Sequence, residues 1–316
     1  MLKRMLGRTG LTVTELCFGA LPLGPLQANI SAEDAVALIR KGFESGINFV
    51  DTAESYQTQS YVGEAIRQTG ADVVVATKSA ATTYADMEKS IERSLRELGR
   101  DVIDIYHLHA ARVSASVFTE REGALACLLK AKETGKIRAV GISTHGVDVV
   151  LEAAQHPEVD VVFPLINQTG MGILNGTRDE MIAAIGKVHA ANKGIYAMKA
   201  LSGGHLIDDI KGAFRFVRDI PGMTSVAVGM VHPDELAMNL QIFSDDSYEP
   251  ILPAETKRKR KRLMVMGFCI GCGRCVSVCP SSALSLKDGK AVVDPEKCIL
   301  CGYCSPGCPM FALRLI

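Results

Sequence analysis

Short apolar runs alternate along the chain with segments in which apolar residues recur at helical spacing. An apolar run bounded by turn residues predicts a buried strand, and recurrence at every third or fourth position predicts an amphipathic helix. The predicted strands lie near residues 16–19, 47–51, 73–77, 103–108, 138–142, 159–163, 194–198 and 224–228. The predicted helices lie near residues 32–45, 60–68, 86–98, 120–134, 146–155, 177–191, 205–217 and 233–243.

The alternation of eight strands with eight helices favours an α/β fold of the (β/α)8 barrel type over residues 1–250. A doubly wound open sheet is the alternative, but such a sheet usually has fewer strands. Residues 2–15, with a turn at Gly7 to Gly10, predict a short hairpin before the first barrel strand.

Composition and charge exclude several classes of protein. The chain has 316 residues, of which 47% are hydrophobic and 22% are charged, so we expect a folded protein with one large and one small domain. The formal net charge is zero, which suggests neither a nucleic-acid nor a membrane partner. We expect a cytoplasmic protein, because the sequence shows no apolar run long enough to cross a bilayer and no signal-peptide pattern at its start.

The cysteines are distributed unevenly. Eight of the ten lie in the last 48 residues, and only Cys17 and Cys127 precede them. Because both of those fall in predicted barrel elements, we expect them to be core thiols. In a reducing cytosol, clustered cysteines are more often metal ligands than disulfides.

The spacing of the eight cysteines indicates the metal. The run C-x2-C-x2-C-x3-C-P occurs twice, from Cys269 to Pro280 and from Cys298 to Pro309, and is typical of bacterial two-cluster ferredoxins. In such proteins the fourth cysteine of each run binds the other cluster, so we expect two [4Fe-4S] clusters. The expected ligands are Cys269, Cys272, Cys275 and Cys308 for one cluster, and Cys298, Cys301, Cys304 and Cys279 for the other. Paired zinc sites are the alternative, but zinc requires neither the third close cysteine nor the Cys-Pro endings.

Residues 264–316 are therefore predicted to form a small α+β ferredoxin-like domain. Residues 251–263 would link it to the barrel and contain the basic run Lys257 to Arg262. This run is either a solvated linker or a site that attracts an acidic electron carrier, such as a soluble ferredoxin or flavodoxin.

Polar residues fall where several barrel strands are predicted to end, which is where (β/α)8 barrels carry their chemistry. Asp51 ends the second strand, Tyr56 follows in the next loop, Lys78 ends the third strand and His109 ends the fourth. The four side chains are thus expected to converge. A plain salt bridge between Asp51 and Lys78 is the structural alternative.

The segments that carry these residues resemble the aldo-keto reductase family. The resemblance lies in residues 48–56, 75–78 and 104–109, with further likeness at 6–11 and 141–143, and it extends from about residue 2 to residue 243. It implies that Asp51, Tyr56, Lys78 and His109 form the catalytic tetrad. Tyr56 would then donate the proton, with its pKa lowered by Lys78, while Asp51 holds Lys78 and His109 orients the substrate carbonyl.

The resemblance also implies a nicotinamide cofactor, NADP(H) or NAD(H), at the barrel mouth, with contacts from Gly19, Ser143, Thr144, Met198 and Gly229. The sequence departs from the family pattern at several of these contacts. Thr144 replaces an asparagine, Met198 replaces an aromatic residue, and Phe163 replaces a glutamine. Glu235 stands where a cation would bind the 2′-phosphate.

Two cofactor options therefore remain open. Backbone amides at Gly229 and at the start of the helix from Pro233 could still hold a phosphate. A flavin in the same mouth is the other option, and it would reconcile one-electron clusters with two-electron hydride chemistry.

The function expected from the sequence is an iron-sulfur oxidoreductase that reduces, or reversibly oxidises, a carbonyl substrate. The second hypothesis is an electron-transfer or redox-sensing protein whose barrel binds a nucleotide or flavin without turnover. Because the C-terminal segment of the family shapes the substrate pocket, we expect the cysteine-rich domain to pack near the catalytic face and bring one cluster close to it.

Overall fold

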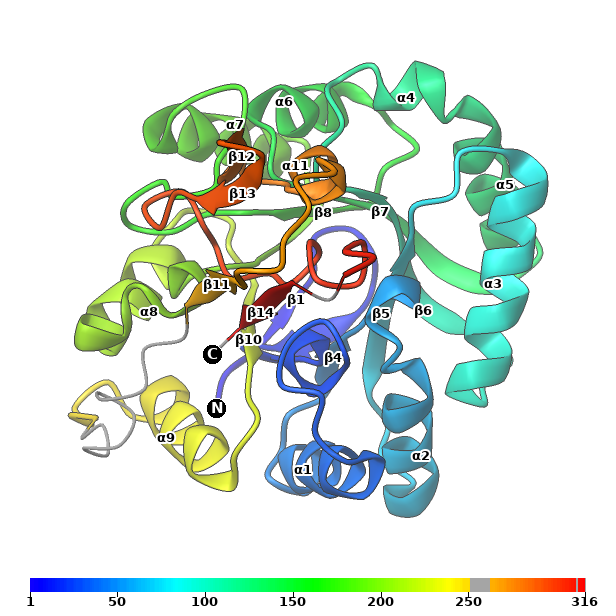
Figure 1. Cartoon of the computed structure of the whole chain (residues 1–316). Helices are drawn as coiled ribbons and strands as arrows, with labels where there is room; N and C mark the ends of the chain where they lie inside the picture. Colours follow the sequence, from blue (N-terminus) through cyan, green and yellow to red (C-terminus); the bar gives the residue numbers. More distant parts are fainter. Residues whose placement is uncertain (251–261, 311, 316) are drawn as a thin grey trace.

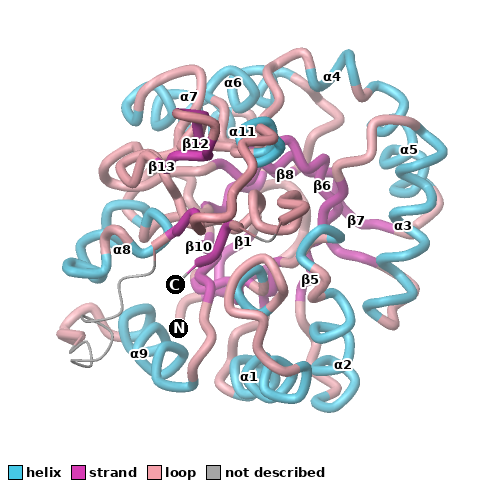
Figure 2. Tube along the Cα trace, viewed as in Figure 1, coloured by secondary structure: helices cyan, strands magenta, loops and turns pink. Residues whose placement is uncertain are grey.

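The computed structural model describes residues 1–250, 262–310 and 312–315, and its largest element is a closed parallel barrel (Figures 1 and 2). Eight strands close in the order β10-β3-β4-β5-β6-β7-β8-β9, so the predicted (β/α)8 barrel is confirmed. The barrel strands are β3 (Leu16–Gly19), β4 (Phe49–Asp51), β5 (Val74–Ser79), β6 (Ile103–Ala110), β7 (Ile137–Thr144), β8 (Val161–Pro164), β9 (Gly194–Ala197) and β10 (Ser225–Gly229).

Helices surround the barrel in the order that the sequence predicts. They are α1 (Ala32–Glu44), α2 (Gln59–Thr69), α3 (Tyr84–Leu98), α4 (Val117–Glu120), α5 (Glu122–Glu133), α6 (Val147–Gln155), α7 (Arg178–Ala190), α8 (Ile210–Arg218) and α9 (Pro233–Ser244). Helix α1 begins where Ser31 Oγ accepts the amide of Asp34, which satisfies one of the free amides of its first turn. One apolar cluster joins the inner faces of the helices to the strands, and a second fills the barrel with side chains such as Phe49, Ile105 and Tyr196.

The amino-terminal hairpin closes the end of the barrel opposite the carboxyl ends of its strands. Strands β1 (Lys3–Met5) and β2 (Thr12–Thr14) pair antiparallel, as the sequence predicts. Leu6, Leu11 and Val13 of this hairpin join the apolar cluster inside the barrel. The other end of the barrel, formed by the carboxyl ends of its strands, is called here the barrel mouth.

Two predicted helices differ from the observed ones. Helix α8 begins at Ile210 rather than near 205, because residues 202–209 form two short 3-10 turns, η3 (Ser202–Gly204) and η4 (Ile207–Asp209), before Asp209 caps α8. The predicted helix 120–134 is divided at Arg121, which leaves helical dihedrals and donates a hydrogen bond to the carbonyl of His109. Gly203 and His205 contact the backbone of Ile299 and Cys298, and Arg121 contacts the end of β6, so in both places a tertiary contact overrides local helix propensity.

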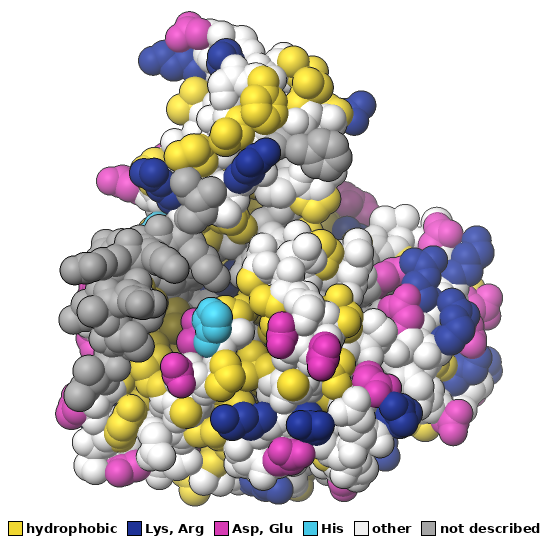
Figure 3. Space-filling model, turned by 60° about the horizontal axis from the view of Figure 1, so that its bottom comes forward, with side chains coloured by type: hydrophobic (Ala, Val, Ile, Leu, Met, Phe, Trp, Pro, Cys, Tyr) yellow, Lys and Arg dark blue, Asp and Glu magenta, His cyan; other side chains and the backbone are white. Residues whose placement is uncertain are grey.

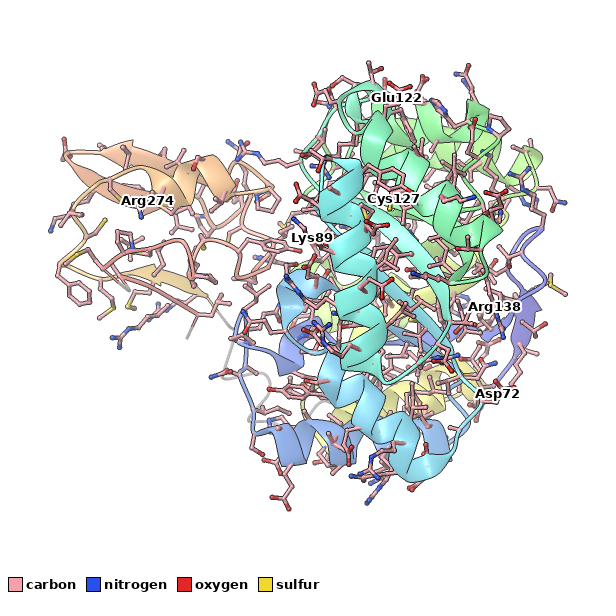
Figure 4. The ribbon with its side chains drawn as sticks, turned by 90° about the vertical axis from the view of Figure 1, so that its right-hand side faces the viewer. Asp72, Lys89, Glu122, Cys127, Arg138 and Arg274 are labelled. Carbon is pink, nitrogen blue, oxygen red and sulfur yellow. The ribbon has the colours of Figure 1, made fainter. Side chains whose placement is uncertain are left out.

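The cysteine-rich domain, residues 262–315, lies over the barrel mouth and projects away from it (Figures 1 and 4). It contains β11 (Leu263–Val265), α11 (Arg274–Val278), β12 (Leu284–Lys287), β13 (Lys290–Val293) and β14 (Leu313–Leu315). Strand β11 pairs with β14, and β12 pairs with β13, both antiparallel. The basic run Lys257 to Arg262 lies outside the described residues except for Arg262, which is exposed.

Among residues 1–250, 262–310 and 312–315, no helix combines the length and the apolarity that crossing a bilayer requires.

Candidate active site

A buried ion pair lies at the centre of the barrel mouth. Lys78 Nζ donates to Asp51 Oδ1 at 2.6 Å and to the carbonyl oxygen of Thr52 at 2.7 Å. The Lys78 side chain is fully buried and that of Asp51 is 5% exposed. Burial raises the pKa of Asp51 and lowers the pKa of Lys78, and their mutual attraction opposes both shifts. Each ion therefore depends on the other to remain charged.

A hydrogen-bonded chain extends from this pair into the barrel. The Tyr196 hydroxyl donates to Asp51 Oδ2 at 2.9 Å, so its oxygen is free to accept from His107 Nε2, which lies 2.8 Å away. Burial and the charge of Lys78 hold the pKa of His107 well below its usual value, so its imidazole is neutral. This chain fixes both carboxylate oxygens of Asp51, and with them the position of Lys78.

Tyr56 closes η2 (Glu54–Tyr56), directly after β4. Lys78 Nζ lies over its ring, 4.8 Å from the ring centroid, and directs its hydrogen bonds to Asp51 and Thr52. Burial raises the pKa of Tyr56 well above its usual value, and Tyr303 and Asp51 raise it further. Burial thus holds this pKa above its usual value despite the nearby charge of Lys78, and Tyr56 is a protonated phenol at neutral pH.

His109 lies edge-on to Tyr56, with ring centroids 5.9 Å apart and an interplanar angle of 85°. Burial lowers its pKa well below the usual value, and the charge of Lys78 lowers it further, so the ring is neutral. Its Nε2 lies 3.2 Å from the hydroxyl of Tyr303, a residue of the cysteine-rich domain. The structure thus brings Asp51, Tyr56, Lys78 and His109 together at one site, with a tyrosine of the second domain beside them.

A large cavity opens beside Asp51 and Tyr56, between the barrel mouth and the cysteine-rich domain. Its empty volume is about 2160 Å³, open solvent included. Three of the five predicted cofactor contacts line it, namely Gly19, Met198 and Gly229, together with Leu300 and Leu315 of the cysteine-rich domain.

Ser143 and Thr144 do not line the cavity. Both are buried at the end of β7, and Thr144 Oγ1 accepts the amide of Gly146 instead. Phe163 does line the cavity, and its ring stacks on Tyr196 with centroids 3.9 Å apart. An amide side chain that could bind a nicotinamide carboxamide is thus replaced here by an aromatic surface.

The amino terminus of α9 is already capped by a carboxylate. Glu235 Oε2 accepts the amide of Val231 at 2.7 Å and that of His232 at 3.3 Å. Both amides precede the first helical residue, Pro233, so a phosphate bound to them would have to displace this carboxylate. Phosphate binding by the amides of Gly229 and of the first turn of α9 stays a prediction.

The cysteines form two sets of four, each around its own cavity. The inner set, Cys279, Cys298, Cys301 and Cys304, lines one cavity, and the outer set, Cys269, Cys272, Cys275 and Cys308, lines the other. Each set has the members that the sequence predicts, because the fourth cysteine of each run lies with the first three of the other run. Within the described part of the chain, no group of three or more His, Cys, Asp or Glu is arranged to hold a single metal ion.

The inner set lies against the barrel. Cys301 joins an apolar cluster with Leu165 of the mouth and with Ile299, whereas Cys272 of the outer set is exposed. In Figure 4, Arg274, which follows the outer set's Cys272 by two residues, lies in the part of the domain that projects from the barrel. This arrangement agrees with the expectation that the cysteine-rich domain packs on the catalytic face. It also places one of the two cysteine sets close to that face.

The contact between the two domains is built on backbone as well as side chains. Gln27 Nε2 donates to the carbonyl of Leu300 at 3.2 Å, and His205 Nε2 lies 2.8 Å from that of Cys298. A Cβ on Gly302 would overlap the carbonyl oxygen of Leu26, and one on Gly203 would overlap that of Ile299. Only glycine allows such close approach, so the loop is fitted to the mouth.

Two residues of the site were not anticipated from the sequence. Tyr196 lies in an apolar strand and belongs to no motif, so nothing in the sequence indicates that its hydroxyl bonds Asp51. Tyr303 lies between Cys301 and Cys304, where the spacing indicates a role for the cysteines but none for the tyrosine. Its contact with His109 joins residues 194 positions apart, which no local pattern reveals.

Comparison with known proteins supports both halves of this description. The sequence model described as "Aldo/keto reductase family" matches residues 15–211, and the one described as "4Fe-4S dicluster domain" matches residues 268–312.

Curated relatives match about half of the chain. L-galactose dehydrogenase of Arabidopsis thaliana is 34% identical over 176 residues, which cover 50% of this chain and 54% of that protein. Pyridoxal 4-dehydrogenase of Microbacterium luteolum is 26% identical over 204 residues, covering 50% of this chain and 60% of that protein. The chain therefore spans little more than half the length of the curated relatives that it matches.

Solved structures show the same fold. A protein of Pseudomonas aeruginosa titled "putative aldo-keto reductase" superimposes with a TM-score of 0.66 at 28% identity, covering 77% of this chain and 94% of that one. An aldo-keto reductase from Bacillus halodurans, at 20% identity and a TM-score of 0.65, shares the fold over 82% of this chain and 94% of that one.

Proposed function

The chain belongs to the aldo/keto reductase family and carries a 4Fe-4S dicluster domain, and from this premise we propose that it is an iron-sulfur oxidoreductase that reduces, or reversibly oxidises, a carbonyl substrate at the barrel mouth. One observation carries the proposal. A protonated Tyr56 and a neutral His109 stand together above the buried Asp51–Lys78 pair, beside the cavity that Gly19, Met198 and Gly229 line.

The residues of this chain account for the proton and for the orientation of the substrate. Tyr56 donates its phenolic proton to the substrate oxygen, and His109, neutral and protonated on Nε2, donates a hydrogen bond to the same oxygen. Lys78 places a fixed positive charge beside Tyr56, which stabilises the phenolate left after transfer. Asp51 and Tyr196 hold that charge in place.

We propose that the protein prefers NAD(H) to NADP(H) as its nicotinamide cofactor. Such a cofactor, when bound, supplies or accepts a hydride beside Tyr56. Gly19, Met198 and Gly229 would line its binding site. Glu235 argues against a 2′-phosphate, because its carboxylate both repels the phosphate and occupies the amides of Val231 and His232.

An anaerobic binding titration tests the nicotinamide proposal. Cluster-loaded protein is titrated with NADH and NADPH by nicotinamide fluorescence, and NADH oxidation is then followed with 4-nitrobenzaldehyde, or NAD⁺ reduction with L-galactose, the sugar in the name of the Arabidopsis relative. We expect NADH to bind about tenfold tighter than NADPH, and Glu235→Ala to remove most of that preference by freeing the two amides. Asp234→Ala, a second acid in the first turn of α9, is the matched control.

The outcomes separate the alternatives. An unchanged preference in Glu235→Ala would remove the role of that residue. Failure of both nucleotides to bind, with tight binding of FMN, would replace the nicotinamide by a flavin. If a nucleotide binds but neither 4-nitrobenzaldehyde, L-galactose nor any other carbonyl compound is turned over, an electron-transfer or sensing role would be favoured.

The two cysteine sets are proposed to hold one [4Fe-4S] cluster each, which would carry single electrons. The inner set adjoins the active site and the outer set lies towards solvent. Two cluster sites in series, from the outer set to the inner set, suit electron exchange with a protein that docks over the outer set. We propose that this protein is a small acidic carrier of the ferredoxin or flavodoxin class.

The surface around the outer set supports this assignment. Four apolar residues around it are 41–59% exposed, namely Phe268, Ile270, Leu286 and Met310. Arg274, Lys287 and Lys290 are exposed beside them, with Asp288 as the neighbouring acid. Figure 3 shows the domain standing above the barrel with hydrophobic and basic side chains next to each other on it. An apolar centre with a basic rim fits a partner whose redox centre has an acidic rim.

Charge reversal on this face tests the docking proposal. In Arg274→Glu/Lys287→Glu we expect reduction of the clusters by reduced flavodoxin at low salt to slow by about tenfold, and to depend less on salt. Reduction by dithionite should stay unchanged. The matched control is Arg67→Glu/Lys130→Glu, on helices α2 and α5 of the barrel. Equal slowing in both double variants, or none in the first, would contradict this docking surface.

A further inference from the structure

The hydroxyl of Tyr303 lies where a substrate oxygen would be received. It is 3.2 Å from His109 Nε2, and its ring packs in the same small cluster as Tyr56, Ala53 and Leu26. The rings of His109 and Tyr303 meet at an angle of 62°, with centroids 6.2 Å apart. A carbonyl oxygen that bonds both Tyr56 and His109 needs the space that this hydroxyl occupies.

The position of Tyr303 is imposed by the loop that carries it. Gly302 touches the backbone of Leu26, and Leu300 accepts a hydrogen bond from Gln27, so the residues just before Tyr303 are fixed on the mouth. Cys301 and Cys304, two members of the inner set, flank Tyr303 in sequence. Cys304 is adjacent to Tyr303 and only Gly302 separates it from Cys301, so a backbone movement at Tyr303 reaches the inner set directly.

We propose that Tyr303 is a specificity-determining residue that occupies the carbonyl-oxygen position between Tyr56 and His109, and that a substrate binds by displacing it. This inference rests on the proposed function, because it takes Tyr56 and His109 as the groups that receive the substrate oxygen. Substrates whose oxygen replaces the hydrogen bond to His109 are admitted, and molecules that lack such an acceptor leave Tyr303 in place.

Displacement makes substrate binding and the state of the inner set interdependent. A ligand that moves Tyr303 shifts the loop from Cys301 to Cys304, and by thermodynamic reciprocity a change at the inner set alters the affinity for that ligand. The cysteine-rich domain would in this way select substrates as well as deliver electrons.

The test uses the full cluster-loaded chain with 4-nitrobenzaldehyde as the probe. In Tyr303→Phe the hydrogen bond that the probe must displace is absent, so we expect the dissociation constant and the KM to fall about fivefold, which is what one neutral hydrogen bond contributes, with kcat unchanged. Tyr106→Phe is the matched control, because it removes a buried hydroxyl bonded to Ser94, outside the site.

Hydrogen exchange and electron paramagnetic resonance give readouts that do not need turnover. Saturating probe should accelerate amide exchange in residues 298–305 of the wild-type chain and change the signal of the reduced inner cluster, and both effects should be absent in Tyr303→Ala. A fall in kcat of Tyr303→Phe at constant KM would instead make Tyr303 a catalytic group and overturn the proposal. An unchanged dissociation constant in Tyr303→Phe, together with unchanged amide exchange on probe binding, would also overturn it. If the dissociation constant and the exchange change as expected but no turnover is found, only the proposed reaction is contradicted.

Discussion

Tyr56→Phe is expected to lower kcat/KM for carbonyl reduction by about 10²- to 10⁴-fold, the range that a positioned proton donor contributes. Tyr56 is the protonated phenol of the site, because burial and the neighbouring Tyr303 raise its pKa. Phenylalanine keeps the ring that packs against Lys78 but removes the acidic hydrogen, so the fold should be preserved. The measurement is steady-state reduction of 4-nitrobenzaldehyde by NADH under anaerobic conditions.

The control for this experiment separates lost chemistry from lost structure. Tyr84→Phe removes a phenol from the exposed start of α3 and should leave the rate within twofold of wild type. Iron content and melting temperature should match in all three proteins. A Tyr56→Phe enzyme that retained its rate would mean that another group, with Tyr303 the nearest phenol, donates the proton.

The fold and much of the site could be predicted because the signals are local. The strand β6 and the helix α1 follow patterns that a short window reveals, and cysteine spacing predicts the two ligand sets before any folding is considered. Asp51 and Lys78 could be paired because the ends of adjacent parallel strands meet at one edge of the barrel.

The remaining features depend on contacts between distant segments. The pKa of Tyr56 is raised chiefly by burial, and the sequence displays the charge of Lys78 but not that burial. Glu235 could be read as repelling a phosphate, yet its hydrogen bonds to Val231 and His232 appear only once α9 is formed. The position of Tyr303 depends on how two domains dock, which no periodicity encodes.

Gly302→Ala is the second change for which we expect a large effect, because it acts on that docking. The residue has a φ of +82°, and its Cβ would overlap the carbonyl oxygen of Leu26, so the loop must move away from the mouth. Since a misplacement of 1 Å in an active site can cost about 100-fold in rate, we expect reduction of 4-nitrobenzaldehyde by NADH to fall by about that factor. Amide exchange of residues 298–305 should rise in the same variant.

Gly273→Ala distinguishes loss of docking from backbone strain. Gly273 has a φ of +76° and also neighbours a cysteine, so alanine there carries a similar strain of about 1–2 kcal/mol. Its Cβ would meet only Leu286 Cδ1 at 3.7 Å, an ordinary contact that leaves the barrel mouth untouched. If both variants keep their iron and only Gly302→Ala loses NADH-driven turnover, the contact with Leu26 is what fits the loop to the active site. If the two lose turnover equally, strain beside a cysteine accounts for the effect, and the fit of the loop to the mouth contributes nothing to the rate.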